Sequence, residues 1–269
     1  MKVMYYPGCT LKTRAKSLDA SAKASLAALG AETVEPARWT CCGVVPALAD
    51  DDVIRLLGPV RNLIRMRNEG ASRVVTACAM CYNSLAKANL LMRNGDERKG
   101  TINRYFEEEE DYNGELEVLH LLQFLRDEIG MDAVRERVRA PLEGMPVAAY
   151  YGCTLLRPPA IAIDSPAHPT ILQDLLEALG AKPVAFPAQS QCCSSFQTAS
   201  HPNEAMQVAS VLTEAAGVSG AEIIVTSCPL CDYNLKAALR NSSAKPKGEN
   251  GLKVVYFTEL LSRAFGLSI

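Results

Sequence analysis

The sequence has little that would direct it to nucleic acid or into a membrane. Among 269 residues, 28 lysines and arginines are balanced by 30 acidic residues, and the formal net charge is -2. A chain with no basic excess lacks the electrostatic signature of a nucleic-acid-binding protein. Residues 1–8 contain no apolar stretch typical of a signal peptide, and no later segment has the length of apolar sequence that spans a bilayer. We therefore expect a cytoplasmic protein with no nucleic-acid partner and no membrane insertion.

No cysteine stands outside a repeated pattern. The chain has ten cysteines, arranged as two copies of one array: a single cysteine, then an adjacent pair, then a C-x-x-C. Structural disulfides do not persist in the cytosol, so this number of thiols indicates metal or redox chemistry. The first copy is Cys9, Cys41, Cys42, Cys78 and Cys81, and the second is Cys153, Cys192, Cys193, Cys228 and Cys231.

The duplication extends beyond the cysteines. Residues 8–11 and 152–155 both read Gly-Cys-Thr-Leu, and residues 28–31 and 178–181 both read Ala-Leu-Gly-Ala. These matches predict two related domains, residues 1–143 and residues 144–269. Changes in the spacing of the matches place extra residues around 93–115 in the first copy and around 164–169 in the second.

Each half reads as strands followed by helices. Short β-rich runs at residues 3–6 and 147–151 lead into a Gly-Cys, and similar runs at 73–77 and 223–227 lead into a C-x-x-C. Helical patterns follow at 20–29, 85–91, 171–179 and 235–239. This alternation predicts an α/β protein of two similar Rossmann-like halves related by a pseudo-twofold axis. Each half would have a parallel sheet, with its cysteines at the carboxyl ends of strands, where ligands usually bind.

Three kinds of thiol chemistry compete for this pattern. A C-x-x-C between strand and helix is typical of a redox dithiol, but that interpretation leaves three cysteines per copy unexplained. Structural zinc takes four tetrahedral ligands, which an adjacent Cys-Cys pair in extended chain supplies poorly. An iron-sulfur cluster removes this difficulty because the two sulfurs of a pair can bind different irons. The spacing favours iron-sulfur and leaves zinc and dithiol chemistry open.

At these residues the chain resembles a known family. The run Cys9, Cys41-Cys42-Gly43 and Cys78-Ala79-Met80-Cys81 is similar to the cysteine-rich CCG domain, and two such domains in one chain resemble the B subunit of heterodisulfide reductase. The resemblance covers nearly the whole chain. It implies that all ten cysteines are ligands of two noncubane 4Fe-4S clusters, with a disulfide substrate bound between them.

The resemblance also implies partner proteins. Members of this family take electrons from a ferredoxin-like iron-sulfur protein, the C subunit of the complex, which a flavoprotein, the A subunit, often supplies. The chain has neither a ferredoxin-type C-x-x-C-x-x-C-x-x-x-C-P run nor a G-x-G-x-x-G nucleotide signature. We therefore expect it to receive electrons from a separate iron-sulfur protein.

Two functions of different classes remain. The leading hypothesis is the catalytic subunit of a complex that reduces a disulfide or oxidises thiols, because two one-electron centres match a two-electron reaction. The alternative is a non-catalytic electron-transfer or docking subunit, as CCG-domain proteins serve in fumarate, succinate, glycerol-3-phosphate or lactate oxidoreductases. A zinc-stabilised structural protein is the third interpretation, and its purified form would be colourless.

Other polar features carry weaker signals. Ser194 follows the second cysteine pair at the position where the motif has glycine. Serine lacks the backbone freedom of glycine, but it could instead donate a hydrogen bond to sulfur. The tyrosine pairs at 5–6 and 150–151 and His120 read as core residues, and the acidic run at 107–111 reads as a solvated face. His168 and His201 in Pro-containing loops are candidate proton donors.

Overall fold

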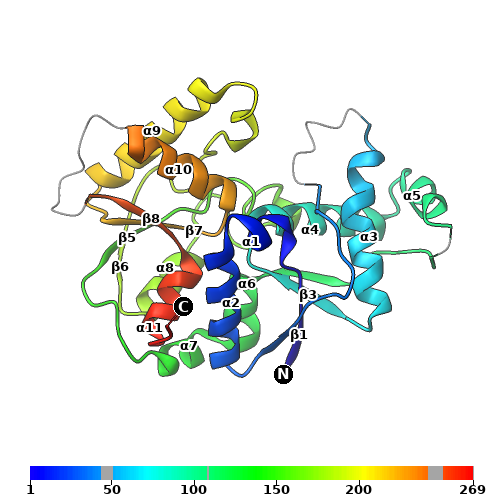
Figure 1. Cartoon of the computed structure of the whole chain (residues 1–269), viewed down its shortest axis with the longest axis horizontal. Coiled ribbons are helices and arrows are strands. Elements are labelled where there is room, and N and C mark those ends of the chain that lie inside the picture. The colour runs from blue at the N-terminus through cyan, green and yellow to red at the C-terminus, as the bar shows by residue number, and fades with distance from the viewer. Residues whose placement is uncertain (44–50, 108, 242–250, 269) are drawn as a thin grey trace.

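The computed structural model describes residues 1–43, 51–107, 109–241 and 251–268, which form two four-stranded sheets (Figure 1). In the first sheet the strands are ordered β2-β1-β3-β4, and in the second β6-β5-β7-β8. Every neighbouring pair is parallel. The strands are β1 (Lys2–Tyr5), β2 (Glu32–Val34), β3 (Arg73–Thr76), β4 (Glu117–His120), β5 (Pro146–Ala149), β6 (Lys182–Val184), β7 (Ile223–Thr226) and β8 (Lys253–Tyr256). The shared order confirms an α/β protein of two similar halves.

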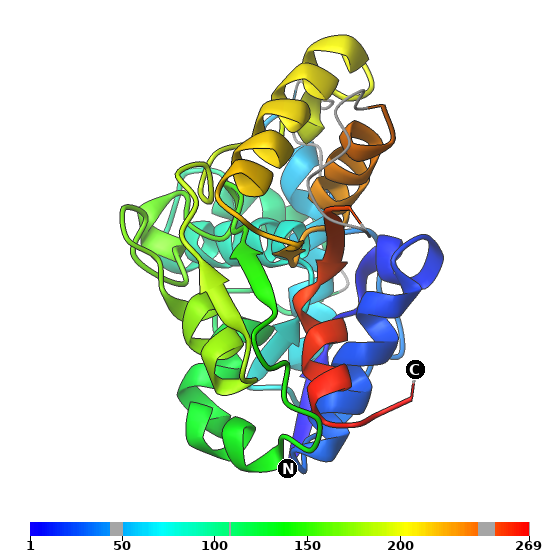
Figure 2. The ribbon, with the colours of Figure 1, turned by 90° about the vertical axis from the view of Figure 1, so that its left-hand side faces the viewer.

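Helices connect these strands and cover the sheets. The central strand β7 has all four residues buried, as a parallel strand covered on both faces requires. Figure 2 shows α9 and α10 at the end of the molecule away from the N-terminus. The helices are α1 (Gly8–Thr13), α2 (Lys16–Ala28), α3 (Ile54–Asn68), α4 (Ala79–Asn94), α5 (Lys99–Tyr105), α6 (Leu121–Phe124), α7 (Met131–Arg137), α8 (Ile171–Ala178), α9 (Pro202–Val218), α10 (Pro229–Asn241) and α11 (Phe257–Ala264). A π-helical turn spans Leu125–Ile129, and 3-10 turns span Pro159–Ile161 and Ser195–Gln197.

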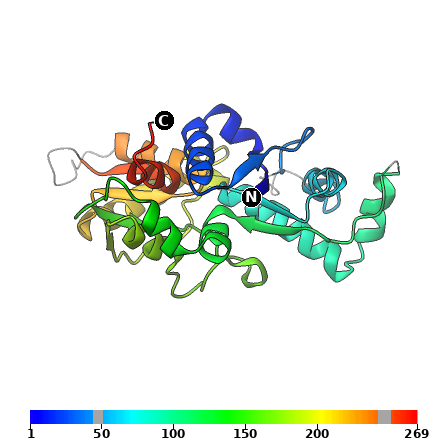
Figure 3. The same ribbon diagram turned by 90° about the horizontal axis from the view of Figure 1, so that it is seen from below.

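Two equivalent helix–helix contacts join the halves. Helix α2 of the first half packs against α11 of the second, and α8 of the second half packs against α6 of the first (Figure 3). Because α2 corresponds to α8 and α6 to α11 in the repeat, these two contacts are related by the pseudo-twofold axis. Within the first contact, the buried hydroxyls of Ser21 and Thr258 lie 2.6 Å apart in a hydrogen bond.

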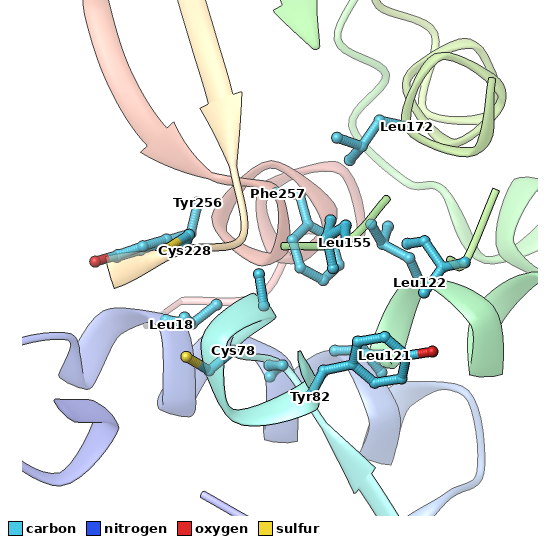
Figure 4. Packing of buried hydrophobic residues seen from close by; sticks show 14 of the residues in the cluster. Leu18, Cys78, Tyr82, Leu121, Leu122, Leu155, Leu172, Cys228, Tyr256 and Phe257 are labelled. Carbon is cyan, nitrogen blue, oxygen red and sulfur yellow. The ribbon is translucent and has the colours of Figure 1, made fainter. Parts of the chain in front are cut away.

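One apolar core runs through both halves. Figure 4 shows Tyr82, Leu121 and Leu122 of the first half packed close to Leu155 and Phe257 of the second. Burying apolar side chains of both halves in one core stabilises their contact in proportion to the area removed from water. The halves are therefore held as one unit, and the exact boundary at residue 143 stays a prediction.

The segments whose lengths differ between the two halves lie outside the elements that the halves share. In the first half the extra residues form α5 and the loop after it, where Tyr112 donates its hydroxyl proton to Asn89 Oδ1. In the second half, the Asp164 carboxylate accepts hydrogen bonds from the N–H groups of Thr170 and Ile171. These N–H groups lie at the start of α8, where no partner is available within the helix. Glu107, Glu110 and Asp111 are exposed as predicted, Glu109 is half-buried, and Glu108 lies outside the described residues.

Helix α4 also holds a loop of the other half. The Asn83 side-chain amide donates to the backbone carbonyls of Thr154 and Arg157, each at 2.7 Å. The Tyr82 hydroxyl donates to the carbonyl of Ile161 at 2.8 Å. The loop that carries Cys153 is thus fixed by side chains that follow Cys81 in the first half.

We predict that Asn83→Leu lowers the free energy of unfolding by about 2 kcal/mol or more, since two largely buried carbonyls lose their donor. Denaturant titration of the anaerobic protein measures this change. Asn94→Leu, an exposed position on the same helix, is the control and should change stability by no more than about 0.5 kcal/mol. Equal losses in the two variants would show that the Asn83 bonds do not hold the halves together.

Candidate metal centres

All ten cysteines lie in the segments that follow the carboxyl ends of strands. Cys9 follows β1 and Cys78 follows β3, so they flank the point where the order of the first sheet reverses. Cys153 and Cys228 occupy the same places after β5 and β7. Loops at such a reversal diverge and leave a crevice that holds ligands in open parallel sheets. The fold therefore brings each set of five cysteines to a position suited to a cofactor.

In the first half the sulfurs contact one another in two subsets, which adjoin at the neighbouring residues Cys41 and Cys42. Cys9 Sγ lies 3.4 Å from Cys41 Sγ, and Cys42 Sγ lies 3.5 Å from Cys81 Sγ. Cys78 is hydrogen-bonded to Cys81, which joins the fifth thiol to the others. Cysteines that lie in loops far apart in the sequence are thus in contact.

The second half repeats this arrangement. Cys153 Sγ lies 3.7 Å from Cys192 Sγ, and Cys193 Sγ lies 3.1 Å from Cys231 Sγ, with Cys228 hydrogen-bonded to Cys231. Exposure is repeated as well: in both halves the single cysteine is half-buried, the first of the pair is exposed and the other three are buried. The predicted site residues are therefore brought together as two matching groups.

The adjacent cysteines point to different partners. Cys41 contacts Cys9 whereas Cys42 contacts Cys81, and the second pair divides between Cys153 and Cys231 in the same way. A donor set of five thiols with divergent neighbours fits a polynuclear iron-sulfur group, whose irons are held by cysteine thiolates. Across the described ranges, no three Cys, His, Asp or Glu side chains are placed as ligands of a single metal ion.

Two buried tyrosines hold the loops with the cysteine pairs. The Tyr6 hydroxyl donates to the carbonyl of Thr40 at 2.6 Å, and the Tyr150 hydroxyl donates to that of Gln191 at 2.7 Å. Each acceptor immediately precedes a Cys-Cys pair. Burial raises the pKa of both tyrosines well above the usual range, so both remain neutral donors. The sequence predicted that these two tyrosines are core residues. The only sequence signal of their role in holding the cysteine loops is that they occupy matching places in the repeat.

Threonines at the ends of the central strands have a matching role. The hydroxyls of Thr76 and Thr226 accept a hydrogen bond from the N–H of Cys78 and Cys228 respectively, each at 3.4 Å. These bonds position the first cysteine of each C-x-x-C where α4 and α10 begin. Like the tyrosines, the two threonines occupy matching places in the repeat.

Ser194 adopts the backbone conformation of the glycine that it replaces. Gly43 has φ 71° and Ser194 has φ 57°, and Ser194 is the one non-glycine residue with positive φ among those described. Its N–H donates to Cys192 Sγ at 3.3 Å. The second loop therefore has the same turn as the first, held at a steric cost that glycine does not incur.

The thiols share protons within each group. A hydrogen bond from Cys81 lowers the pKa of Cys78, whereas hydrogen bonds with Cys42 and Cys78 raise the pKa of Cys81. The pKa of Cys192 is lowered to about 6, first by the hydrogen bond from Cys153 and then by the Ser194 N–H and the Arg157 charge. In each half at least one thiol pKa is lowered, which favours the thiolate, the form that binds metal.

His120 is a structural residue, as the sequence predicted. Its Nε2 lies 3.2 Å from the carbonyl of Ala77, and its Nδ1 accepts from the N–H of Leu122. Burial lowers its pKa to about 3, so the ring is neutral near pH 7. His168 and His201 are exposed, and their role as proton donors stays a prediction.

The profile of the cysteine-rich domain CCG matches residues 3–86 and 147–236. The chain belongs to this family, with one domain in each half. The two matched segments contain all ten cysteines, the strands β2, β3, β6 and β7, and all but the first residue of β1 and of β5.

Several curated proteins are similar to this chain over nearly its full length. The 8-methylmenaquinol:fumarate reductase membrane anchor subunit of Wolinella succinogenes is 29% identical over 265 residues, covering 98% of this chain and 92% of that protein. The B subunit of the ferredoxin/F420H2-dependent CoB-CoM heterodisulfide reductase of Methanosarcina acetivorans is 26% identical, covering 99% and 90% respectively. The B subunit of a ferredoxin:CoB-CoM heterodisulfide reductase from Methanosarcina mazei is 25% identical over 271 residues, covering 99% and 90%.

Among solved structures, that of a hypothetical protein from Helicobacter pylori has a TM-score of 0.74 at 13% identity. The match covers 100% of this chain, which spans 49% of that one. This likeness concerns the fold alone. In this chain, no helix within the described residues is long and apolar enough to cross a membrane.

The tightest glycine contact at the sites is at Gly8. A Cβ atom there would lie 2.6 Å from Cys81 Sγ, whereas one at Gly152 would lie 3.5 Å from Cys231 Sγ. We predict that Gly8→Ala displaces the Cys81 sulfur and lowers the iron content of the anaerobically purified protein by about half, because one of two cysteine groups is disturbed. Iron and sulfide analysis measures the effect.

Gly30→Ala is the matched control for Gly8→Ala. Gly30 has nearly the same φ, +77° against +73°, but an added Cβ would meet no atom within 4 Å. The control has the same backbone strain without the sulfur contact and should retain its iron. Equal iron loss in both variants would assign the effect to strain and not to the sulfur.

Proposed function

We propose that this chain is the disulfide-reducing subunit of an iron-sulfur oxidoreductase complex and that its ten cysteines hold two 4Fe-4S clusters. A noncubane cluster type, as the family resemblance implies, is part of the proposal. Such clusters, when bound, supply one-electron transfer, and two of them match the two electrons that a disulfide takes up. The cytoplasmic location is likewise proposed.

The observation that carries this proposal is that the loops of the two complete cysteine groups adjoin. The N–H of Ala79, inside the first C-x-x-C, donates to the carbonyl of Ser227, next to Cys228, at 3.2 Å. A small cavity between the halves is lined by Cys9, Cys42, Cys78 and Cys81 together with Pro229 and Leu230. Two clusters held by these adjoining loops would be near enough to act on one substrate, an arrangement that a simple electron conduit does not need.

The chain's own side chains position the cysteine loops and determine which cysteines are accessible. Tyr6, Tyr150 and the two threonines hold the cysteine loops rigidly, and the buried cysteines are shielded from water. The exposed Cys41 and Cys192, together with the half-buried Cys9 and Cys153, mark the open side of each cysteine group. The site is therefore pre-organised on its inner side and open on its outer side.

The relatives support the same class of protein. Two of them are B subunits of heterodisulfide reductases, which favours an oxidoreductase complex with partner subunits for this chain as well. A ferredoxin-like C subunit as electron donor, with a flavoprotein A subunit behind it, is the proposed arrangement. The disulfide itself is the substrate class, from a small molecule or a protein.

A second candidate is a non-catalytic electron-transfer or docking subunit. The observation that favours it is the 29% identity to the membrane anchor of an 8-methylmenaquinol:fumarate reductase. In that case the chain would pass electrons without binding a disulfide. Reduced viologen with a disulfide discriminates between the two, because only the disulfide-reducing protein would oxidise the viologen.

We predict that Cys41→Ser and Cys81→Ser abolish disulfide reduction through the first cysteine group, and that Cys193→Ser and Cys231→Ser abolish it through the second. Wild-type protein should contain roughly 8 irons and 8 sulfides per chain, and each variant about half as much. Viologen oxidation, iron analysis and the electron paramagnetic resonance spectrum provide the measurements. Full activity in a variant whose second cysteine group no longer holds iron would show that this group is structural and not catalytic.

We also predict that the isolated chain does not use NADH as electron donor, since it has no nucleotide signature. Anaerobic native purification should recover it with a ferredoxin-like iron-sulfur protein, and adding that protein in reduced form should restore disulfide reduction. Reduced viologen, which needs no docking site, is the positive control. Turnover of the lone chain with NADH would contradict the proposed arrangement of partners.

A further inference from the structure

Three arginines gather on the outer face of the first half. Arg61 and Arg65 lie one turn apart on α3, and Arg38 lies in the loop that leads to Cys41. Partial burial lowers the pKa of the Arg65 guanidinium, and the charges of Arg38 and Arg61 lower it further. Glu109 opposes these effects. Three like charges therefore lie close together on one face.

None of these three arginines forms an ion pair within the part of the chain that the structure describes. Neighbouring arginines are different, since Arg67 pairs with Glu115 and Arg73 pairs with Glu117. The Nε atom of Arg61 is buried and has no hydrogen-bond partner among the described residues. Because like charges repel, a partner that brings carboxylates to this face would relieve the repulsion.

An aromatic pair from the extra segment of the first half completes this surface. The Arg61 guanidinium lies 4.8 Å from the centre of the Phe106 ring in a cation–π contact. Tyr105, at the end of α5, packs edge-on against Phe106 and is 61% exposed. Figure 1 shows α3 and α5 at the end of the molecule away from the second half. Arginine and tyrosine are enriched in protein–protein interfaces. We call Arg38, Arg61, Arg65 and Tyr105 the arginine surface.

The arginine surface adjoins the loop of the exposed Cys41. Asn62, next to Arg61 on α3, accepts a hydrogen bond from the N–H of Thr40 at 2.8 Å and donates to the Thr40 carbonyl at 2.9 Å. One turn earlier, a Cβ atom added at Gly58 would lie 3.1 Å from the carbonyl oxygen of Cys41. The backbone before and at Cys41 thus lies directly against α3. A protein docked on the arginine surface would therefore approach the first cysteine group on its exposed side.

The places in the second half that match two of these arginines hold uncharged residues. Counted from the shared Gly-Ala at 70–71 and 220–221, Val211 replaces Arg61 and Ala215 replaces Arg65. Val211 is 61% exposed, so the matching place on α9 is apolar and open to solvent. The segment that carries Tyr105 lies among the extra residues of the first half. Both halves thus have a cysteine group, whereas the arginine surface belongs to the first half.

We propose that the arginine surface is the docking site of an acidic electron-transfer protein that delivers electrons to the first cysteine group. This proposal rests on the proposed function and specifies where the iron-sulfur partner binds and what it presents, namely carboxylates around its own redox centre. Complementary charges speed the encounter and fix its orientation. Each encounter would oxidise the partner by one electron and reduce this chain by one, so electrons would enter through the first half.

The test uses the complete, anaerobic protein and a two-cluster bacterial ferredoxin, which is a small acidic protein. Calorimetric titration with oxidised ferredoxin gives the affinity, and rapid mixing with reduced ferredoxin gives the rate of electron transfer. At low ionic strength both should fall about tenfold in the double variant Arg38→Gln/Arg65→Gln, as expected for the loss of two exposed ion pairs. Added salt should weaken the wild-type complex more than that of the variant, because salt screens charges across the interface.

The matched control is Arg240→Gln/Arg263→Gln, which removes two exposed arginines from α10 and α11 of the second half. It loses the same net charge and should keep the wild-type affinity and rate. Arg65→Lys keeps the charge and should retain most of the affinity. Reduced viologen, which needs no docking site, should reduce the protein and both double variants equally. Equal losses in the two double variants, or no loss in either, would overturn the proposal.

The binding measurement separates this proposal from the proposed function, because oxidised ferredoxin binds without turnover. Binding that depends on Arg38 and Arg65, in a protein that reduces no disulfide, would sustain the arginine surface and overturn the proposed function. Ferredoxin-driven disulfide reduction at an equal rate in wild type and Arg38→Gln/Arg65→Gln would do the reverse. A short RNA duplex is the third probe, since arginines also bind phosphates. Tighter binding of this RNA than of ferredoxin, lost in the double variant, would assign the surface to nucleic acid and overturn the proposal.

Discussion

The structure depends on one constraint: thiols that are far apart in sequence must meet at the carboxyl ends of parallel strands. Cys9, Cys42 and Cys81 come from three separate loops, yet Cys42 and Cys81 lie 3.5 Å apart and Cys9 contacts Cys41. Only a sheet with all strands parallel directs these loops to one edge. The buried tyrosines and strand-end threonines then fix the loops, and the apolar core between the halves brings the loops of the two cysteine groups against each other.

Duplication explains what the halves share, and divergence explains where they differ. Strand order, cysteine contacts and the exposure of each cysteine repeat closely. The differences are confined to the surroundings: Ser194 stands for glycine, Tyr256 for His120, and Lys87 faces the other half where its counterpart is Ala237. Residues that hold the cysteines are thus kept in both halves.

Much of the site could be predicted because the number and spacing of the cysteines can be read directly from the sequence. The cysteine arrays, the strands that precede them and the parallel sheets followed from the repeat and from apolar patterning. Helices α4 and α10 were predicted too short, since their first turns carry cysteines and polar residues that give no apolar period. The tyrosine hydroxyls and the Asn83 bridge could not be predicted, because their acceptors are backbone carbonyls in loops whose paths depend on packing.

The sequence by itself determined the class of chemistry, the duplication and the ten residues on which the candidate site is built. These depend on residue identity and spacing, which folding does not alter. The tertiary structure decided how the halves face each other, which cysteine meets which, and which loops of the two halves adjoin. Those features arise where α4 of one half packs on the loop after β5 of the other, and a contact between elements so distant in sequence is set by the burial of a shared core.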